Sequence, residues 1–216
     1  MVKKPPGGPG RAKEGCAPPA KKKAAKAGID PVELRLKNLT DARLIGTLKA
    51  GAAKFGWTPK AAPSGRGVGV VCGIDAGTYD TLMVEVTVDK ATGAVRVKRV
   101  VCAQDQGVIV NPAGSLQQVE GCITMGLGYT FSEEIRFKGG DIFDKSFDTY
   151  GLPRFSQVPQ IDTVFIDAPD VPAQGCGEPA IVPLGAAVAN AIYDTLGARI
   201  FQLPMTPARV KAAMRG

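Results

Sequence analysis

The sequence contains no histidine, and this absence excludes several kinds of active site within the chain. Serine and cysteine hydrolases use a histidine to take the proton of the nucleophile. Histidine is also a frequent metal ligand and the usual general base near neutral pH. Any proton transfer must therefore use a carboxylate, lysine, tyrosine or cysteine side chain, or a bound cofactor.

The cysteines lack the spacing of a metal-binding loop. No two of them form a C-x-x-C pair, so neither a zinc knuckle nor an iron–sulfur loop is encoded; the five positions are Cys16, Cys72, Cys102, Cys122 and Cys176. An odd number argues against a fully paired disulfide framework. Reduced thiols are the simplest account, and we predict a cytoplasmic location, with the periplasm open to a chain exported together with a partner.

Long apolar runs are missing as well. No run reaches the ~18 residues that a membrane-spanning helix needs. Residues 1–28 also lack the apolar middle of a secretory signal. We therefore expect no membrane span.

The net charge of +7 is confined to the start of the chain. Residues 1–28 contain eight lysines and arginines and one glutamate, whereas the remainder contains 19 basic and 19 acidic residues. Residues 1–27 have few apolar side chains, so we predict a disordered, basic, low-complexity tail. Such a tail is suited to nucleic acid or acidic lipid, but the neutral body makes a nucleic-acid binder the least favoured function.

Residues 28–216 are predicted to form one segment of interleaved helices and β-hairpins. Capping residues and apolar spacing indicate helices at 31–39, 41–55, 111–134, 182–196 and 206–214. Partly alternating apolar residues indicate strands at 68–73, 80–88, 94–104 and 161–167, with a turn at 89–93 and a short hairpin at 135–143. This order is typical of an α+β or mixed α/β fold.

The longest predicted helix, 111–134, combines an apolar stripe with glycines. Asn111 and Pro112 form a typical helix start, and the expected buried stripe is Leu116, Val119, Ile123 and Leu127. Glycine lowers helix stability by up to about 1 kcal/mol per residue, yet this helix contains Gly121, Gly126 and Gly128. Such a sequence indicates close packing against another element or a ligand.

The most informative motif is residues 175–179, Gly-Cys-Gly-Glu-Pro, which precede an apolar helical run. Glycines let the backbone approach a bulky ligand, and proline suits a helix start. A helix start offers free N–H groups and the positive end of the helix dipole. This arrangement can aim one carboxylate, Glu178, into a pocket; a glycine-rich loop with a solvated glutamate is the alternative.

Three segments, in this order, resemble one known family. Residues 30–39 resemble the DPxExRxxN helix of molybdenum hydroxylase large subunits. Asn111-Pro112, with residues 118–121 and 126–128, resembles their NP…QxEG…GLG helix, and residues 177–179 resemble their catalytic loop. The chain is similar to the C-terminal part of a molybdopterin-binding subunit of the xanthine dehydrogenase and aldehyde oxidase family, of the isoquinoline 1-oxidoreductase type.

The resemblance implies a site for a molybdenum–molybdopterin cofactor of the cytosine dinucleotide type, with no protein ligand to the metal. Glu178 would be the general base in the oxidation of an aldehyde or N-heterocycle with water-derived oxygen. Gln118 would hydrogen-bond the pterin, and Cys176 and Gly177 would lie along the cofactor with their backbone. Without the resemblance, Gln118 would be a helix-surface glutamine and Cys176 a small buried residue.

The resemblance also implies partners and leaves two functions open. Electrons would pass to iron–sulfur clusters on a partner chain, a two-iron–two-sulfur subunit. The upstream loops that hold much of the pterin in the family have no counterpart in this sequence. The chain would be either the C-terminal catalytic segment of a molybdenum hydroxylase, or a truncated non-catalytic remnant or split-subunit assembly piece that needs the upstream half as a partner.

Overall fold

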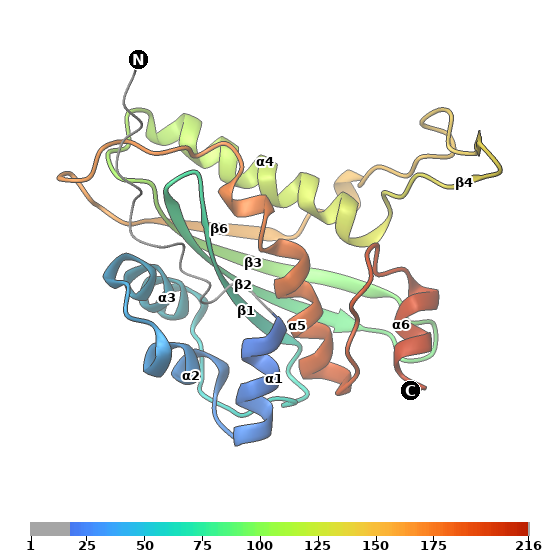
Figure 1. The fold of residues 1–216 in the computed structure, drawn as a ribbon, viewed down its shortest axis with the longest axis horizontal. Coiled ribbons are helices and arrows are strands. Elements are labelled where there is room, and N and C mark those ends of the chain that lie inside the picture. The colour runs from blue at the N-terminus through green and yellow to red at the C-terminus, as the bar shows by residue number, and fades with distance from the viewer. Residues whose placement is uncertain (1–17, 216) are drawn as a thin grey trace, which may run out of the picture.

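A four-stranded mixed sheet forms the centre of the protein, in a computed structural model that describes residues 18–215 (Figure 1). Its strands lie in the order β1 (Val68–Asp75), β2 (Thr78–Val88), β3 (Val95–Asp105) and β6 (Gln160–Phe165). The first three strands pair antiparallel, whereas β6 pairs parallel with β3 after a long excursion. The arrangement confirms the predicted mixed fold of interleaved helices and strands.

Helices cover both faces of this sheet (Figure 1). α2 (Pro31–Asn38) and α3 (Ala42–Phe55) pack on one face, and α4 (Pro112–Phe131) and α5 (Leu184–Leu196) on the other. α1 (Pro18–Ala27) contacts α2 and α5, and α6 (Pro207–Ala213) adds to the α4–α5 layer. Successive strand residues point to opposite faces, so each helical layer has its own core. The larger core includes Val71, Leu82, Val100, Ile123, Leu184 and Ile192.

Side-chain caps fix the helix starts that the sequence predicts. The Asp30 carboxylate accepts hydrogen bonds from the N–H groups of Val32 (2.8 Å) and Glu33 (3.0 Å), and Asp41 caps α3 in the same way. Asp30 also accepts a hydrogen bond from the Trp57 indole (3.0 Å), which ties α2 to the loop after α3. Each cap is worth ~1 kcal/mol. The two predicted helices in this region are confirmed.

The predicted tail needs a correction at its end. Residues 18–27 form α1 and are not disordered, while residues 1–17, with Cys16, lie outside the described residues. Alanine and lysine are good helix formers, and Ala24 is completely buried where α1 packs. The helical structure therefore begins before residue 28, the boundary that composition suggested.

The inward face of α4 differs from the prediction at one position. The other members of the expected stripe are buried, but Leu116 is 38% exposed. Ser115 lies inward instead, where its hydroxyl oxygen accepts a hydrogen bond from the Gln106 amide (2.8 Å). No helix in residues 18–215, α4 included, is both long enough and apolar enough to cross a membrane.

Residues 135–150 extend away from the sheet as an arm (Figure 1). The predicted hairpin is reduced here to two residues in each strand, β4 (Phe137–Lys138) and β5 (Asp141–Ile142), and a 3₁₀ turn, η1 (Phe155–Gln157), follows further along. Longer strands need an apolar face to bury, and the phenylalanines of the arm are exposed instead: Phe137, Phe143 and Phe147.

Close contact with α5 explains two glycines. A Cβ on Gly69 of β1 would lie 2.1 Å from the Ala187 carbonyl oxygen, so α5 rests directly on the strand. A Cβ on Gly126 of α4 would lie 2.6 Å from the Leu184 Cδ2 atom. The prediction of close packing is therefore confirmed at Gly126, whereas Gly121 has open space around it.

Candidate functional site

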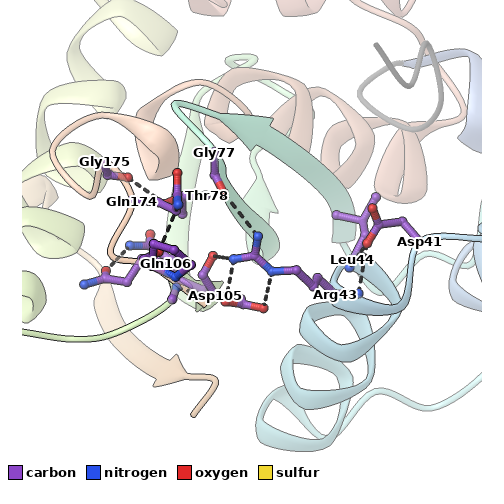
Figure 2. Close-up of polar contacts among 12 residues, drawn as sticks. Asp41, Arg43, Leu44, Gly77, Thr78, Asp105, Gln106, Gln174 and Gly175 are labelled. Carbon is purple, nitrogen blue, oxygen red and sulfur yellow. Dashed lines mark hydrogen bonds and ion pairs between the residues drawn. The ribbon is translucent and has the colours of Figure 1, made fainter. Parts of the chain in front are cut away.

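The Gly-Cys-Gly-Glu-Pro loop lies against the turn that joins β1 and β2. The Thr78 hydroxyl donates a hydrogen bond to the Gly175 carbonyl oxygen (2.6 Å), and the Gly175 N–H donates to the Ala76 carbonyl oxygen (3.2 Å). The Gln174 N–H donates to the Gln106 carbonyl oxygen (2.9 Å), just beyond β3. These contacts, which involve residues labelled in Figure 2, fix the start of the loop to the sheet.

The β1–β2 turn has a left-handed backbone, which allows the Gly-Cys-Gly-Glu-Pro loop to pack against it. Ala76 (φ +48°) and Gly77 (φ +80°) are its central residues, as in the primed turns of two-residue hairpins. A Cβ at position 77 would lie 2.1 Å from the Gln174 Oε1 atom. The φ of Gly77 therefore favours glycine here, and the Gln174 side chain fills the space that a Cβ would need.

An ion pair between distant segments holds this end of the sheet. The Arg43 guanidinium of α3 makes two hydrogen bonds to the Asp105 carboxylate (2.7 and 2.8 Å) and a longer one to the Gly77 carbonyl oxygen (3.4 Å) (Figure 2). The hydrogen bonds from Arg43 lower the pKa of Asp105, and those same bonds raise the pKa of Arg43. Sequence reasoning missed this pair, because neither residue lies in a motif that indicates the other.

We predict that Thr78→Val loosens the loop while preserving the shape of the side chain. The hydroxyl contact with Gly175 is lost, and a net hydrogen bond is worth about 1 kcal/mol. The half-buried Cys176 thiol should then react faster with an alkylating reagent, measured in a Cys16→Ser background because the other cysteines are buried. Thr87→Val, at an exposed position of the same strand, is the control. An unchanged labelling rate at Cys176 would contradict the prediction.

Glu178 lies at the surface, at the start of the 3₁₀ turn η2 (Pro179–Ile181). Its side chain is exposed and makes no capping hydrogen bond, so the expected inward orientation is not found within residues 18–215. Pro183 separates this turn from α5, which begins at Leu184 and not at residue 182. The positive end of the long helix dipole therefore lies beyond Glu178. Its role as a base stays a prediction.

Gln118 of α4 lies beside the same loop. Its Oε1 atom is 3.8 Å from the place of a Cβ on Gly177, and the Cys122 thiol, one turn further along α4, donates to the Gly177 carbonyl oxygen (2.9 Å). Burial raises the pKa of Cys122, and the Glu178 carboxylate raises it further, so the thiol keeps its proton. Sequence reasoning missed Cys122, although its four-residue spacing from Gln118 places both on one side of the helix.

The structure therefore brings the predicted site residues to one surface. Gln118 and Glu178 are exposed, and Cys176 is an unpaired, half-buried thiol. The N–H groups of Cys176, Gly177 and Glu178 donate no hydrogen bond within residues 18–215. Successive free N–H groups attract oxygen-rich or anionic ligands, and an amide side chain offers both donors and an acceptor. These residues fit the edge of a pterin cofactor.

Comparisons with known proteins identify the family of the chain. Residues 74–159, which include β2, β3 and α4, match the molybdopterin cofactor-binding domain family. A nicotinate dehydrogenase subunit of Pseudomonas putida is 35% identical over 209 residues, 89% of this chain and 18% of the relative. The beta subunit of isoquinoline 1-oxidoreductase of Brevundimonas diminuta is 29% identical over 196 residues, 89% of this chain and 25% of the relative.

Solved structures give the same result. Aldehyde oxidoreductase from Desulfovibrio gigas has a TM-score of 0.58 at 33% identity, over 64% of this chain and 16% of that one. Quinoline 2-oxidoreductase from Pseudomonas putida 86 has a TM-score of 0.60 at 27% identity, over 64% of this chain and 19% of that one. The chain thus spans a quarter or less of the length of these relatives.

Residues 74–159, with β2, β3 and α4, are those of a molybdopterin cofactor-binding domain. The chain belongs to the xanthine dehydrogenase and aldehyde oxidase family of molybdenum hydroxylases, among its molybdopterin-binding subunits. The members of this family are oxidoreductases that depend on the molybdenum cofactor.

Proposed function

We propose that this chain forms the glutamate side of the active site of a molybdenum hydroxylase, which oxidises an aldehyde or an N-heteroaromatic compound with water-derived oxygen. One observation carries the proposal: α4 and the loop bring Gln118, Gly177 and Glu178 to one surface that has free N–H groups. The substrates named for the relatives, nicotinate, isoquinoline and aldehydes, support the substrate class.

Each of these residues has a chemical role in the proposal. When bound, the molybdenum cofactor supplies the redox centre that takes two electrons from the substrate. Glu178 is the general base and accepts the proton of the oxygen nucleophile on its carboxylate. Gln118 binds the pterin edge through its amide, and the backbone of Cys176 and Gly177 lies along the cofactor. The Cys122 thiol donates a hydrogen bond to the Gly177 carbonyl oxygen and so fixes the loop to α4.

We also propose the type of cofactor, the partner chains and the cellular compartment. The cofactor is the cytosine dinucleotide form, and a two-iron–two-sulfur subunit accepts the electrons; the relatives are themselves named as subunits, which supports an assembly. The upstream half of a molybdopterin-binding subunit completes the pocket, since this chain spans about a fifth of its relative. The buried thiols of Cys102 and Cys122, which form no disulfide bond, support a cytoplasmic setting.

A second candidate function is a non-catalytic assembly piece or remnant. The exposure of both Glu178 and Gln118 favours it, because residues 18–215 alone do not enclose a ligand between them. Metal and pterin analysis separates the two functions. The catalytic segment should contain molybdenum and pterin when it is purified with its partners, whereas a remnant should contain neither, alone or in complex.

We predict that Gln118→Leu weakens cofactor binding in the assembled protein. The amide can make two hydrogen bonds to a pterin edge, and their loss at about 1 kcal/mol each lowers affinity by roughly tenfold or more. Molybdenum content per chain after dialysis is the measurement. Gln117→Leu, at the adjacent exposed position of α4, is the control and should retain the metal. Equal metal content in both variants would refute a ligand role for Gln118.

A further inference from the structure

A buried carboxyl group lies in the sheet at the end where the glutamate loop packs. Asp80 of β2 is 1% exposed, and neither of its carboxyl oxygens makes a hydrogen bond of regular geometry within residues 18–215. It points to the same face of the sheet as Leu82 and Val84, which is the face that α4, α5 and η2 cover. An unpartnered buried carboxylate is costly, so the site calls for a specific explanation.

The neighbouring strand provides the room for this carboxyl group. Gly73 of β1 lies directly opposite Asp80, and a Cβ on Gly73 would lie only 2.2 Å from the Asp80 Oδ1 atom. The carboxyl group therefore occupies the space that a side chain at position 73 would fill.

No positively charged group among the described residues is coupled to Asp80. The pKa of Asp80 is raised from 3.8 to about 8, chiefly by burial; the Asp75 carboxylate on β1 adds to the increase, and the nearby Gly73 N–H opposes it. The other titratable groups coupled to Asp80 are the thiols of β1, β3 and α4: Cys72, Cys102 and Cys122. Glu178, at the start of η2, raises the pKa of the Cys122 thiol in the same direction. The surroundings thus favour the neutral acid.

A series of amide hydrogen bonds begins at Gln104, the residue of β3 that is paired with Asp80. Gln104 of β3 lies opposite Asp80, and its Nε2 atom donates to the Gln106 Oε1 atom (2.7 Å). The Gln106 Nε2 atom donates in turn to the Ser115 hydroxyl (2.8 Å), in the first turn of α4. These hydrogen bonds therefore run in one direction, from Gln104 to Ser115. No group in residues 18–215 donates to the buried Gln104 Oε1 atom, where the series begins.

We propose that Asp80 is a positioning residue that is protonated in the folded protein, with its O–H group donating to the Gln104 Oε1 atom. One proton then satisfies both orphaned groups and completes a chain from β2 to Ser115 of α4. Side chains directly opposite on antiparallel strands lie within reach of such a bond. Loss of the proton places two acceptors against each other and weakens the attachment of α4, the helix that carries Gln118. The link to cofactor binding rests on the proposed function; the buried proton does not.

The proposal gives a definite dependence of stability on pH. Because the pKa of Asp80 is raised in the folded state, the folded protein holds one proton more than the unfolded chain between pH 3.8 and about 8. Stability from this group is fully present below pH 3.8 and is lost as the pH rises through about 8. The unfolding equilibrium constant should increase by up to about tenfold per pH unit in this window.

The test uses the full chain and the variant Asp80→Asn. An asparagine amide donates to the Gln104 Oε1 atom as the neutral acid does, so the variant should fold and should lose the Asp80 part of the pH dependence. Urea unfolding from pH 4 to pH 9 measures the difference between the two proteins. Infrared spectra of protein with isotope-labelled aspartate should show a protonated carboxyl band near pH 6 that Asp80→Asn lacks. Asp75→Asn removes the neighbouring charge and should move the loss of that band to lower pH.

Two outcomes would overturn the proposal. One is equal pH dependence of unfolding in the parent protein and Asp80→Asn; the other is a spectrum near pH 6 without a protonated carboxyl band that depends on Asp80. If Asp80→Asn fails to fold, the parent spectrum and its shift in Asp75→Asn still decide the matter. None of these measurements requires bound cofactor, so a failed test here is distinct from a failure to find molybdenum or pterin in the complex.

Discussion

Glu178→Gln should lower the turnover number of the assembled enzyme by about 100- to 10,000-fold, the range that a general base typically contributes. Glutamine has nearly the same shape as glutamate but cannot accept the proton of the nucleophile. The side chain is exposed and makes no capping hydrogen bond, so the substitution should leave folding unchanged. Steady-state rates with an aldehyde or N-heteroaromatic substrate, divided by molybdenum content, give the comparison.

A neighbouring acid provides the control for this prediction. Glu120 lies on the exposed side of α4, two residues beyond Gln118, and Glu120→Gln removes the same charge without removing the proposed base. It should keep most of the activity. A Glu178→Gln enzyme that turns over at the parent rate, with full metal content, would rule out Glu178 as the base.

Gly69→Ala should strongly destabilise the protein, although it adds only one methyl group. The added Cβ would lie 2.1 Å from the Ala187 carbonyl oxygen and 2.7 Å from the Ala191 nitrogen, which are both backbone atoms of α5. Neither can rotate away, so the whole helix must shift from β1. Overpacking of this kind costs about 1–3 kcal/mol, and the urea midpoint should fall accordingly, with an unchanged slope.

The matched control carries the same chemical change in open space. Gly46 lies within α3, and a Cβ placed on it meets no atom within 4 Å. Gly46→Ala should therefore stabilise the protein, by up to about 1 kcal/mol, because alanine is the better helix former. If both variants shift the urea midpoint in the same direction, close contact between α5 and β1 is not what requires glycine at position 69.

Local signals in the sequence predict those parts of the fold that depend on near neighbours. Asp30 and Asp41 predict the starts of their helices, because a capping side chain accepts hydrogen bonds from N–H groups two or three residues later. The strands of the sheet follow from their apolar patterns in the same way. The expected stripe of α4 is wrong only at Leu116, where Ser115 meets the buried amide of Gln106.

Features that depend on distant segments could not be predicted. Arg43 and Asp105 meet only because α3 packs against the sheet, and 62 residues of sequence separate them. Asp80 and Gln104 face each other only once the strand register is known. The exposure of Glu178 is a further case, because the motif indicates a helix start but not the direction in which the carboxylate points. The resemblance predicts the residues of the candidate site, and the structure shows which contacts surround them.

The position of α5 has a consequence for synthesis on the ribosome. The three antiparallel strands and α4 emerge before this helix, which forms only when residues 184–196 have been made. Until then, the strand face that α5 covers presents apolar groups such as Val71 to the surrounding water. A nascent chain with such a surface is a target for chaperones. The glutamate loop, residues 175–179, likewise emerges only after the strands that it contacts.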